Sequence, residues 1–169
     1  WKAVEHNPIA LMKTFSKAQI EALENDKAFV EKLNLTYARF KEYMSAKPAD
    51  NHTIAYFSME YGLTKSLKIY SGGLGILAGD YLKQASDSNA NLLAIGLLYR
   101  YGYFAQDLSV WGEQLSEYIP QNFSYLPMEA VCDENGNELR INIAFPGRTV
   151  YAKAWRVPVG RINLYLLDT

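Results

Sequence analysis

Three stretches near the middle of the chain decide its fold. Residues 53–58 read TIAYFS, residues 71–80 read SGGLGILAGD and residues 91–99 read NLLAIGLLY. The first and the third stretch are apolar on both faces, which is typical of buried strands in a parallel sheet. The middle stretch places a glycine turn before an apolar segment, residues 76–85, that predicts a helix. Strand, glycine turn, helix and strand together predict a right-handed βαβ unit.

The segment before this unit reads as helices, over residues 7–47. Asn7 followed by Pro8 is typical of a helix N-cap with proline at the first helical position, and residues 16–19, SKAQ, form a capping box. The apolar residues of the third helix recur at steps of three and four and share one face: Phe29, Leu33, Tyr37, Phe40 and Met44. We therefore expect an N-terminal helical layer that packs on the sheet, with Phe29, Leu33, Tyr37 and Phe40 buried.

The segment after the βαβ unit has the sequence pattern of an antiparallel sheet. Residues 133–136 read DENG, which is a hairpin signal. Three loosely alternating runs follow and are separated by proline–glycine turns: residues 139–144, 149–157 and 161–167. This pattern predicts a C-terminal antiparallel β-meander.

The whole chain therefore reads as α/β. Its 169 residues have the size of one domain. We divide that domain into a helical segment over residues 1–50, a βαβ core with the glycine-rich loop over residues 51–110, and the β-meander over residues 111–169.

Composition excludes several classes of function. The net charge is −1 and the lysines and arginines are scattered, so we expect no nucleic-acid partner. No apolar run is long enough to cross a bilayer. Cys132 is the only cysteine, so the chain has no disulfide framework, which favours a reducing, cytoplasmic location. His6 and His52 lack the spacing of metal ligands, and we expect no metal site.

The glycine-rich loop, residues 72–75, is the best candidate for binding chemistry. Glycines let the backbone approach a ligand closely, and the first N–H groups of a helix favour an anion, so a phosphate or a sugar oxygen could lie there. A tight turn that only permits close packing is the alternative. The loop also fits the G-x-G-x-x-A dinucleotide fingerprint, but residues 91–99 lack the acidic residue which that fingerprint requires. Glu60 follows a strand at the ligand-binding edge of the sheet and could bond a sugar, orient a loop or face solvent.

Three ordered motifs resemble the bacterial and archaeal branch of the glycogen/α-glucan phosphorylases. They are residues 54–63 (IAYFSMEYGL), residues 70–80 (YSGGLGILAGD) and residues 96–104 (GLLYRYGYF). The helices after Asn7 and the patches at residues 155–157 and 166–168 are similar too, so the resemblance covers almost the whole chain. The resemblance to the animal-type branch is looser.

The resemblance implies a two-domain glycosyltransferase of the GT-B type, of which the chain would be a partial, Rossmann-like N-terminal domain. It implies reversible phosphorolysis of α-1,4-glucan to glucose 1-phosphate in a cleft between the domains, with pyridoxal phosphate acting through its 5′-phosphate. Gly72, Gly73, Leu74 and Gly75 match the loop beside the substrate phosphate and the coenzyme, and Glu60 matches a carboxylate of the same cleft. The Schiff-base lysine belongs to the C-terminal domain, so no catalytic residue is assigned in this chain and we expect the chain alone to be inactive.

The partners implied are α-glucan, phosphate and the C-terminal domain of the same protein, and a homo-oligomer is allowed. Two alternatives remain open. One is the N-terminal domain of a nucleotide-sugar-dependent glucan synthase, although there the Gly-Gly-Leu loop usually follows a lysine near the N-terminus, whereas Tyr70 and Ser71 precede it here. The other is a non-catalytic module that binds glucan or only packs against a partner domain.

Overall fold

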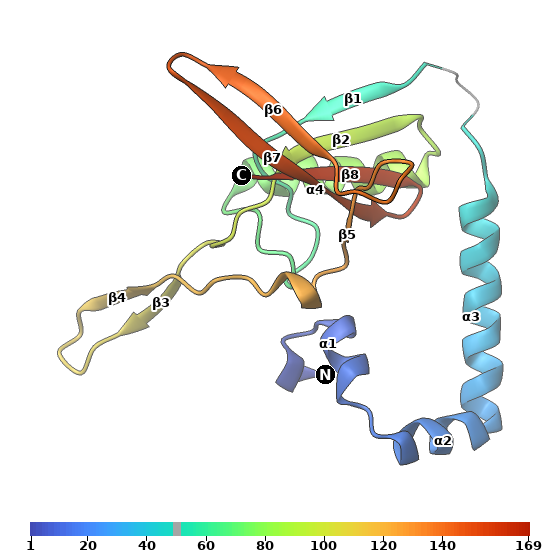
Figure 1. Cartoon of the computed structure of the whole chain (residues 1–169). Helices are drawn as coiled ribbons and strands as arrows, with labels where there is room; N and C mark the ends of the chain where they lie inside the picture. The colour runs from blue at the N-terminus through green and yellow to red at the C-terminus, as the bar shows by residue number, and fades with distance from the viewer. Residues whose placement is uncertain (49–51) are drawn as a thin grey trace.

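The protein has a mixed α/β architecture in a computed structural model that describes residues 1–48 and 52–169 (Figure 1). The helices are α1 (Pro8–Thr14), α2 (Lys17–Asn25), α3 (Lys27–Ser45) and α4 (Gly73–Asp87), with short 3-10 turns at Lys2–Val4 and Phe123–Tyr125. The strands are β1 (Ile54–Phe57), β2 (Leu92–Leu97), β3 (Ala105–Leu108), β4 (Gln114–Glu117), β5 (Glu129–Ala130), β6 (Arg140–Phe145), β7 (Arg148–Val159) and β8 (Ile162–Asp168). The predicted boundary between the helical segment and the βαβ core, near residue 50, lies outside the described residues.

The predicted βαβ unit and β-meander are both present, and they share one sheet. Its strand order is β1-β2-β8-β7-β5, with β6 also paired to β7. β1 runs parallel to β2, and β2 runs parallel to β8, where Leu93 lies opposite Asn163. β6, β7 and β8 follow one another as antiparallel neighbours. Strand β8 therefore joins the parallel half to the antiparallel half, a long-range pairing that the two sequence patterns did not reveal.

The core lies between α4 and the sheet. Ala78, Leu82 and Ala85 of α4 are buried together with alternate residues of β2 and β8, among them Ala94 and Leu164, and α4 runs behind these strands in Figure 1. The helix also lies very close to the loop after β1. A Cβ added to Gly79 would come within 2.2 Å of the carbonyl oxygen of Gly62, so this approach requires glycine.

Strand β1 differs from the expected buried strand. It lies at the edge of the sheet, paired only with β2 among the described strands. Its side chains are largely exposed, and Phe57 is 69% exposed. An apolar run on both faces predicted a buried strand, but among the described elements none pairs with the outer edge of β1, and its side chains stay largely exposed.

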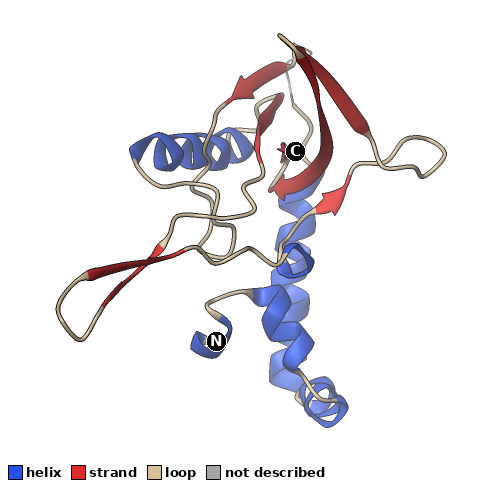
Figure 2. Ribbon diagram, turned by 60° about the vertical axis from the view of Figure 1, so that its left-hand side comes forward, coloured by secondary structure: helices blue, strands red, loops and turns tan. Residues whose placement is uncertain are grey.

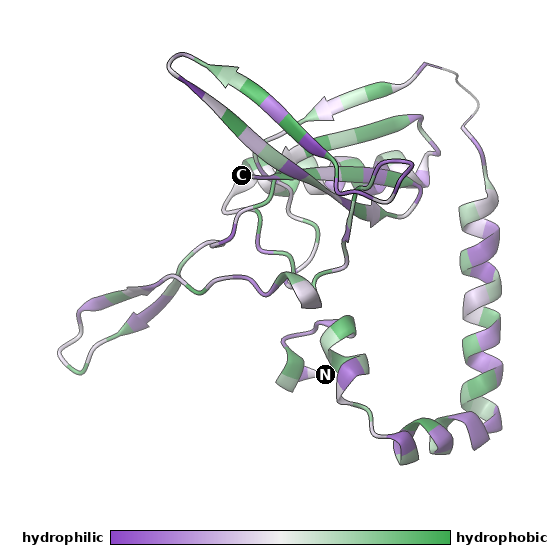
Figure 3. Cartoon of the chain, viewed as in Figure 1, coloured by the Kyte–Doolittle hydropathy of each residue, from purple (hydrophilic) through white to green (hydrophobic). Residues whose placement is uncertain are grey.

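The expectation of a helical layer packed on the sheet is wrong for this chain. The helices form, and the predicted caps at Asn7 and Ser16 are present, but α3 extends away from the sheet instead of lying across it (Figures 1 and 2). The four side chains expected to be buried are 41% to 58% exposed: Phe29, Leu33, Tyr37 and Phe40. Figure 3 shows apolar and polar bands alternating along this uncovered helix. Helical spacing identified an apolar face but did not identify what covers it.

In the described part of the chain, helix α3 is attached to α4 and to the β7–β8 turn near its C-terminal end. The hydroxyl of Tyr43 lies 2.6 Å from the hydroxyl of Ser86 and donates to Asp87 at 2.8 Å. Arg161, at the β7–β8 turn, donates to the carbonyl of Tyr43 at 2.6 Å, and its guanidinium lies over the Tyr43 ring at 3.7 Å. This small polar contact fixes one end of a long helix.

A second sheet, formed by the β3–β4 hairpin, projects away from the body (Figure 1). The side chain of Trp111 at its tip is 86% exposed. The sequence analysis did not predict this hairpin. Among the described residues, none of the helices has the length and apolar character that crossing a membrane requires.

Candidate functional site

The glycine-rich loop lies where β1, β2 and α4 meet. Helix α4 begins at Gly73, with Gly72 in extended conformation at its N-cap. A hydrogen bond joins the segment after β1 to the segment after β2: the hydroxyl of Tyr99 donates to the carbonyl of Met59 at 3.0 Å. The carboxyl ends of parallel strands are the usual ligand-binding edge of an α/β sheet. The predicted loop and Glu60 are therefore brought together at that edge.

Glu60 contacts the residue just before the loop. Its Oε2 accepts a hydrogen bond from the backbone N–H of Ser71 at 3.1 Å, and its Oε1 accepts one from the Ser71 hydroxyl at 2.8 Å. The Ser71 N–H, followed by the Ser71 hydroxyl, lowers the pKa of the Glu60 carboxyl below its usual value, and the backbone N–H groups of Gly72 and Gly75 add to the effect. Of the roles weighed from the sequence, these contacts favour the orientation of a loop.

The four loop residues differ in what surrounds them. A Cβ added to Gly75 would lie 2.4 Å from the Cβ of Tyr70, so this glycine serves close packing. A Cβ added to Gly72 or Gly73 would meet nothing within 4 Å. Packing among the described residues therefore accounts for Gly75, but it does not account for Gly72 and Gly73.

Two backbone donors remain unused at the same place. In the described part of the chain, the N–H groups of Gly73 and Leu74 donate to no protein acceptor, whereas the N–H of Ile76, two residues further into the helix, bonds the carbonyl of Gly72 at 3.2 Å. The first N–H groups of a helix lack partners inside the helix and attract anions or polar oxygens. The exposed side of the loop can thus bind an oxygen atom of a ligand through the backbone.

A cavity of about 260 Å³ adjoins the loop, and we call it the tyrosine-lined cavity. Its walls include Glu60 and Ser71 together with four tyrosines: Tyr70, Tyr99, Tyr101 and Tyr103. Burial, followed by the negative charge of Glu60, raises the pKa of Tyr99. Aromatic rings beside a carboxylate and backbone donors suit a polyhydroxylated ligand, which offers both apolar faces and hydroxyl groups.

A neighbouring cavity of about 240 Å³ supplies positive charge. It is lined by Lys65, Lys68, Tyr70, Ser71 and Tyr103. The sequence analysis missed both lysines, Tyr70 and Ser71. The position of Ser71, directly before the two glycines, was the one available signal, because serine commonly bonds groups near a helix start.

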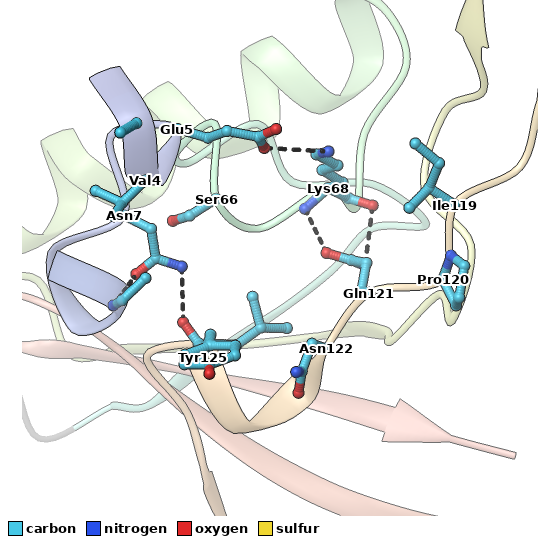
Figure 4. A pocket seen from close by; sticks show the side chains of 13 residues that line it. Val4, Glu5, Asn7, Ser66, Lys68, Ile119, Pro120, Gln121, Asn122 and Tyr125 are labelled. Atoms are coloured by element: carbon cyan, nitrogen blue, oxygen red, sulfur yellow. Dashed lines mark hydrogen bonds and ion pairs between the residues drawn. The ribbon is translucent and has the colours of Figure 1, made fainter. Parts of the chain in front are cut away.

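A further cavity of about 370 Å³ lies between the N-terminal segment and residues 119–126 (Figure 4). Its polar side chains are engaged within the protein. The amide of Asn7 donates to the carbonyl of Tyr125 at 2.9 Å, and the amide of Gln121 bonds both the N–H and the carbonyl of Lys68. The Lys68 ammonium lies 3.8 Å from a Glu5 carboxylate oxygen. The Asn7 bond and the Glu5 ion pair hold the N-terminal segment to the body, so we assign this cavity a structural role.

Known proteins resemble this chain over nearly all of its length. The chain is 40% identical over 171 residues to the maltodextrin phosphorylase of Thermococcus litoralis, a match that covers 96% of this chain and 21% of that protein. It is 38% identical over 183 residues to the glycogen phosphorylase of Mycobacterium tuberculosis, covering 100% of this chain and 21% of that protein. The chain belongs to the glycogen/α-glucan phosphorylases. The resemblance drawn from the three sequence motifs is thereby confirmed.

The chain spans only a part of these phosphorylases. It covers 21% of the two proteins just named, and 25% of the glycogen phosphorylase of Aquifex aeolicus, to which it is 36% identical. Residues 1–67 also match a family described as a protein of unknown function, DUF3417. This match contains the N-terminal helices and β1, and it ends just before the glycine-rich loop.

Proposed function

We propose that the chain is the N-terminal part of an α-1,4-glucan phosphorylase, a glycosyltransferase that cleaves glycogen, starch or maltodextrin with phosphate and releases glucose 1-phosphate. The observation that carries this proposal is the open surface over Gly72 and Gly73, where two unused backbone N–H groups directly follow Ser71, a residue that lines the tyrosine-lined cavity. The names of the similar phosphorylases supply the reaction class.

The residues of this chain act mainly by binding and orienting. The N–H groups of Gly73 and Leu74 donate to an oxygen of phosphate or sugar. Because these donors are in place at the start of α4 before the reaction, they stabilise developing charge without reorganising during it. The tyrosine rings hold sugar faces and exclude water from part of the cleft. Lys65 and Lys68 contribute positive charge beside the loop.

The residues at the loop fit one side of a phosphate-bearing coenzyme. Pyridoxal phosphate, which the family implies, would supply a phosphate that exchanges protons with the substrate phosphate. In this chain Gly73 and Leu74 offer donors to such a group, and the space above Gly72 and Gly73 is open to it. We assign neither Lys65 nor Lys68 the role of Schiff-base lysine, which we place in the C-terminal domain of the same protein.

The same proposal covers the fold and the location of the whole protein. We infer a GT-B arrangement in which this chain forms one wall of the cleft and a second domain forms the other. Cys132 as the only cysteine favours the cytoplasm.

The test compares the purified chain with the full-length protein. Each is incubated with pyridoxal phosphate, glycogen and phosphate. We expect the full-length protein to show an imine absorbance band that resists dialysis and to release glucose 1-phosphate, and we expect the chain alone to show neither. Activity of the chain alone would overturn its assignment as an incomplete half-site. Synthesis from a nucleotide-sugar donor, without phosphorolysis, would identify a glucan synthase instead.

A substitution in the loop tests the role of the loop itself. Gly73→Val in the full-length protein places a branched side chain in the open space over the loop, so we expect turnover to fall far more than stability. Ala18→Val, at an exposed first-turn position of α2, is the matched control and leaves turnover unchanged. Unchanged phosphorolysis in Gly73→Val would remove the loop from the mechanism.

A further inference from the structure

We propose that Glu60 is a positioning residue. Its carboxylate binds Ser71 and thereby holds the glycine-rich loop so that the N–H groups of Gly73 and Leu74 face the ligand. Its role in turnover rests on the function proposed above, whereas its effect on the loop does not.

The backbone around Glu60 is itself firmly held. The Ser58 hydroxyl donates to the Glu60 carbonyl at 2.9 Å and accepts from the Glu60 N–H at 3.4 Å. The next residue, Tyr61, is fully buried, and its hydroxyl donates to the carbonyls of Tyr56 and Ile95 in β1 and β2. The N–H of Gly62 then bonds the carbonyl of Gly75 in α4 at 2.7 Å. Glu60 therefore extends from a segment that is fixed to two strands and one helix.

Both oxygens of the Glu60 carboxylate are directed at the loop. Each accepts one hydrogen bond from Ser71, and Oε2 lies against the first turn of α4, 3.0 Å from where a Cβ of Gly75 would be. Charge-assisted hydrogen bonds of this kind are stronger than neutral ones.

Helix α4 needs such support because its own N-cap cannot provide it. The N-cap residue is Gly72, which has no side chain, and no side-chain cap is present there. Serine, threonine, aspartate or asparagine usually performs this task. Here Glu60, eleven residues before Ser71, instead fixes the chain just before the N-cap by accepting from the Ser71 N–H. Without the Glu60–Ser71 contact, two consecutive glycines would be free to sample many backbone conformations. The two unused N–H groups would then no longer point in a fixed direction.

This assignment separates two kinds of kinetic effect. A residue that bonds the substrate equally in the ground state and the transition state changes KM when it is removed, whereas one that aims donors at the reacting centre changes kcat. Small misplacements of catalytic groups cost up to about 100-fold in rate. We therefore expect Glu60→Ala in the full-length protein to lower kcat about 10- to 100-fold, with KM for glucan and phosphate nearly unchanged.

Two further variants and one control sharpen the test. Glu60→Gln keeps an acceptor for the Ser71 N–H and is expected to retain an intermediate kcat. Ser71→Ala combined with Glu60→Ala is expected to be no worse than Glu60→Ala alone, since both act through one contact. Asp133→Ala is the control, because Asp133 likewise accepts backbone N–H bonds, from Asn135 at 2.9 Å and Asn137 at 2.8 Å, but belongs to a distant turn. We expect the control to leave kcat and KM unchanged.

Hydrogen exchange in the full-length protein gives a readout that does not depend on activity. Amides in residues 70–77 are expected to exchange faster in Glu60→Ala and Glu60→Gln, while those of β2 are unchanged. A raised KM at constant kcat, or a lowered kcat with unchanged exchange in residues 70–77, would overturn the positioning role. If the wild-type protein releases no glucose 1-phosphate, the proposed function fails, and the exchange result still decides whether Glu60 holds the loop.

Discussion

The close packing of α4 against the loop after β1 yields a quantitative prediction for Gly79→Ala. The new methyl carbon would lie 2.2 Å from the carbonyl oxygen and 2.6 Å from the carbonyl carbon of Gly62. Both distances are well short of ordinary van der Waals contact, which begins near 3.4 Å, and the distance to the oxygen is short by more than 1 Å. Helix α4 must therefore move away from the loop, which stretches the 2.7 Å bond from the Gly62 N–H to the Gly75 carbonyl.

Overpacking of this kind costs about 1–3 kcal/mol, and a weakened buried hydrogen bond adds about 1 kcal/mol. The higher helix propensity of alanine offsets about 1 kcal/mol. We therefore expect Gly79→Ala to lower the free energy of unfolding by about 1–3 kcal/mol. Gly73→Ala is the matched control, since its methyl group meets nothing within 4 Å and its stability should change by less than about 0.5 kcal/mol.

Urea unfolding of the purified chain, followed by far-ultraviolet circular dichroism, measures both variants. Equal stability of Gly79→Ala and the wild-type chain would refute the reasoning, because α4 could not then lie as close to Gly62 as the structure places it. A destabilised Gly73→Ala variant would show that the surface over the loop is covered within the chain.

Three further predictions follow from the same structure. Phe40→Ala should change the free energy of unfolding of the chain by less than about 1 kcal/mol in urea, because Phe40 is 53% exposed and leaves no closed cavity. Tyr43→Phe removes the hydroxyl that bonds Ser86 and Asp87 and should cost about 1 kcal/mol; no change in the unfolding midpoint would show that α3 is not fixed there. The stability difference between the wild-type chain and Glu60→Gln should be present at neutral pH and disappear as the pH falls below the ordinary glutamate range. Ser71 lowers the pKa of the folded Glu60 carboxyl, so its contribution is lost on protonation, and unfolding measured across pH tests this.

Local sequence patterns predicted which helices and strands form in this fold, but they did not predict which of these elements contact one another. The βαβ unit and the meander were each visible because their hydrophobic periods and turn residues lie within short windows. Their union through β8 was not visible. The buried residues of β8, Ile162, Leu164 and Leu166, fit a meander strand as well as a parallel partner of β2, and β8 makes both pairings at once. Only the core that these strands share with α4 shows this.

The candidate site was likewise predicted in part. The glycines predicted a turn with exposed backbone groups. The position of Glu60 after a strand predicted a carboxylate at the same edge of the sheet. Their connection through Ser71 depends on the path of residues 61–70, which have no regular period and form no helix or strand. A hydrogen bond across such a segment cannot be deduced from spacing. The division of the loop into a packing glycine, Gly75, and two open glycines also depends on neighbours that only the folded chain supplies.

The small positive charge near the glycine-rich loop indicates why, under the proposed function, the loop needs a second domain to bind phosphates. The N-terminus of a helix supplies about half a unit of positive charge, and the Glu60 carboxylate, held ionised by Ser71, places a negative charge beside it. A coenzyme phosphate and a substrate phosphate would bring several more negative charges to the same place. Lys65 and Lys68 line a neighbouring cavity, and the Lys68 ammonium already lies 3.8 Å from Glu5. Under the proposed function, the loop of this chain therefore orients the N–H groups of Gly73 and Leu74 toward the ligand. Most of the positive charge that holds the phosphates comes from the other domain.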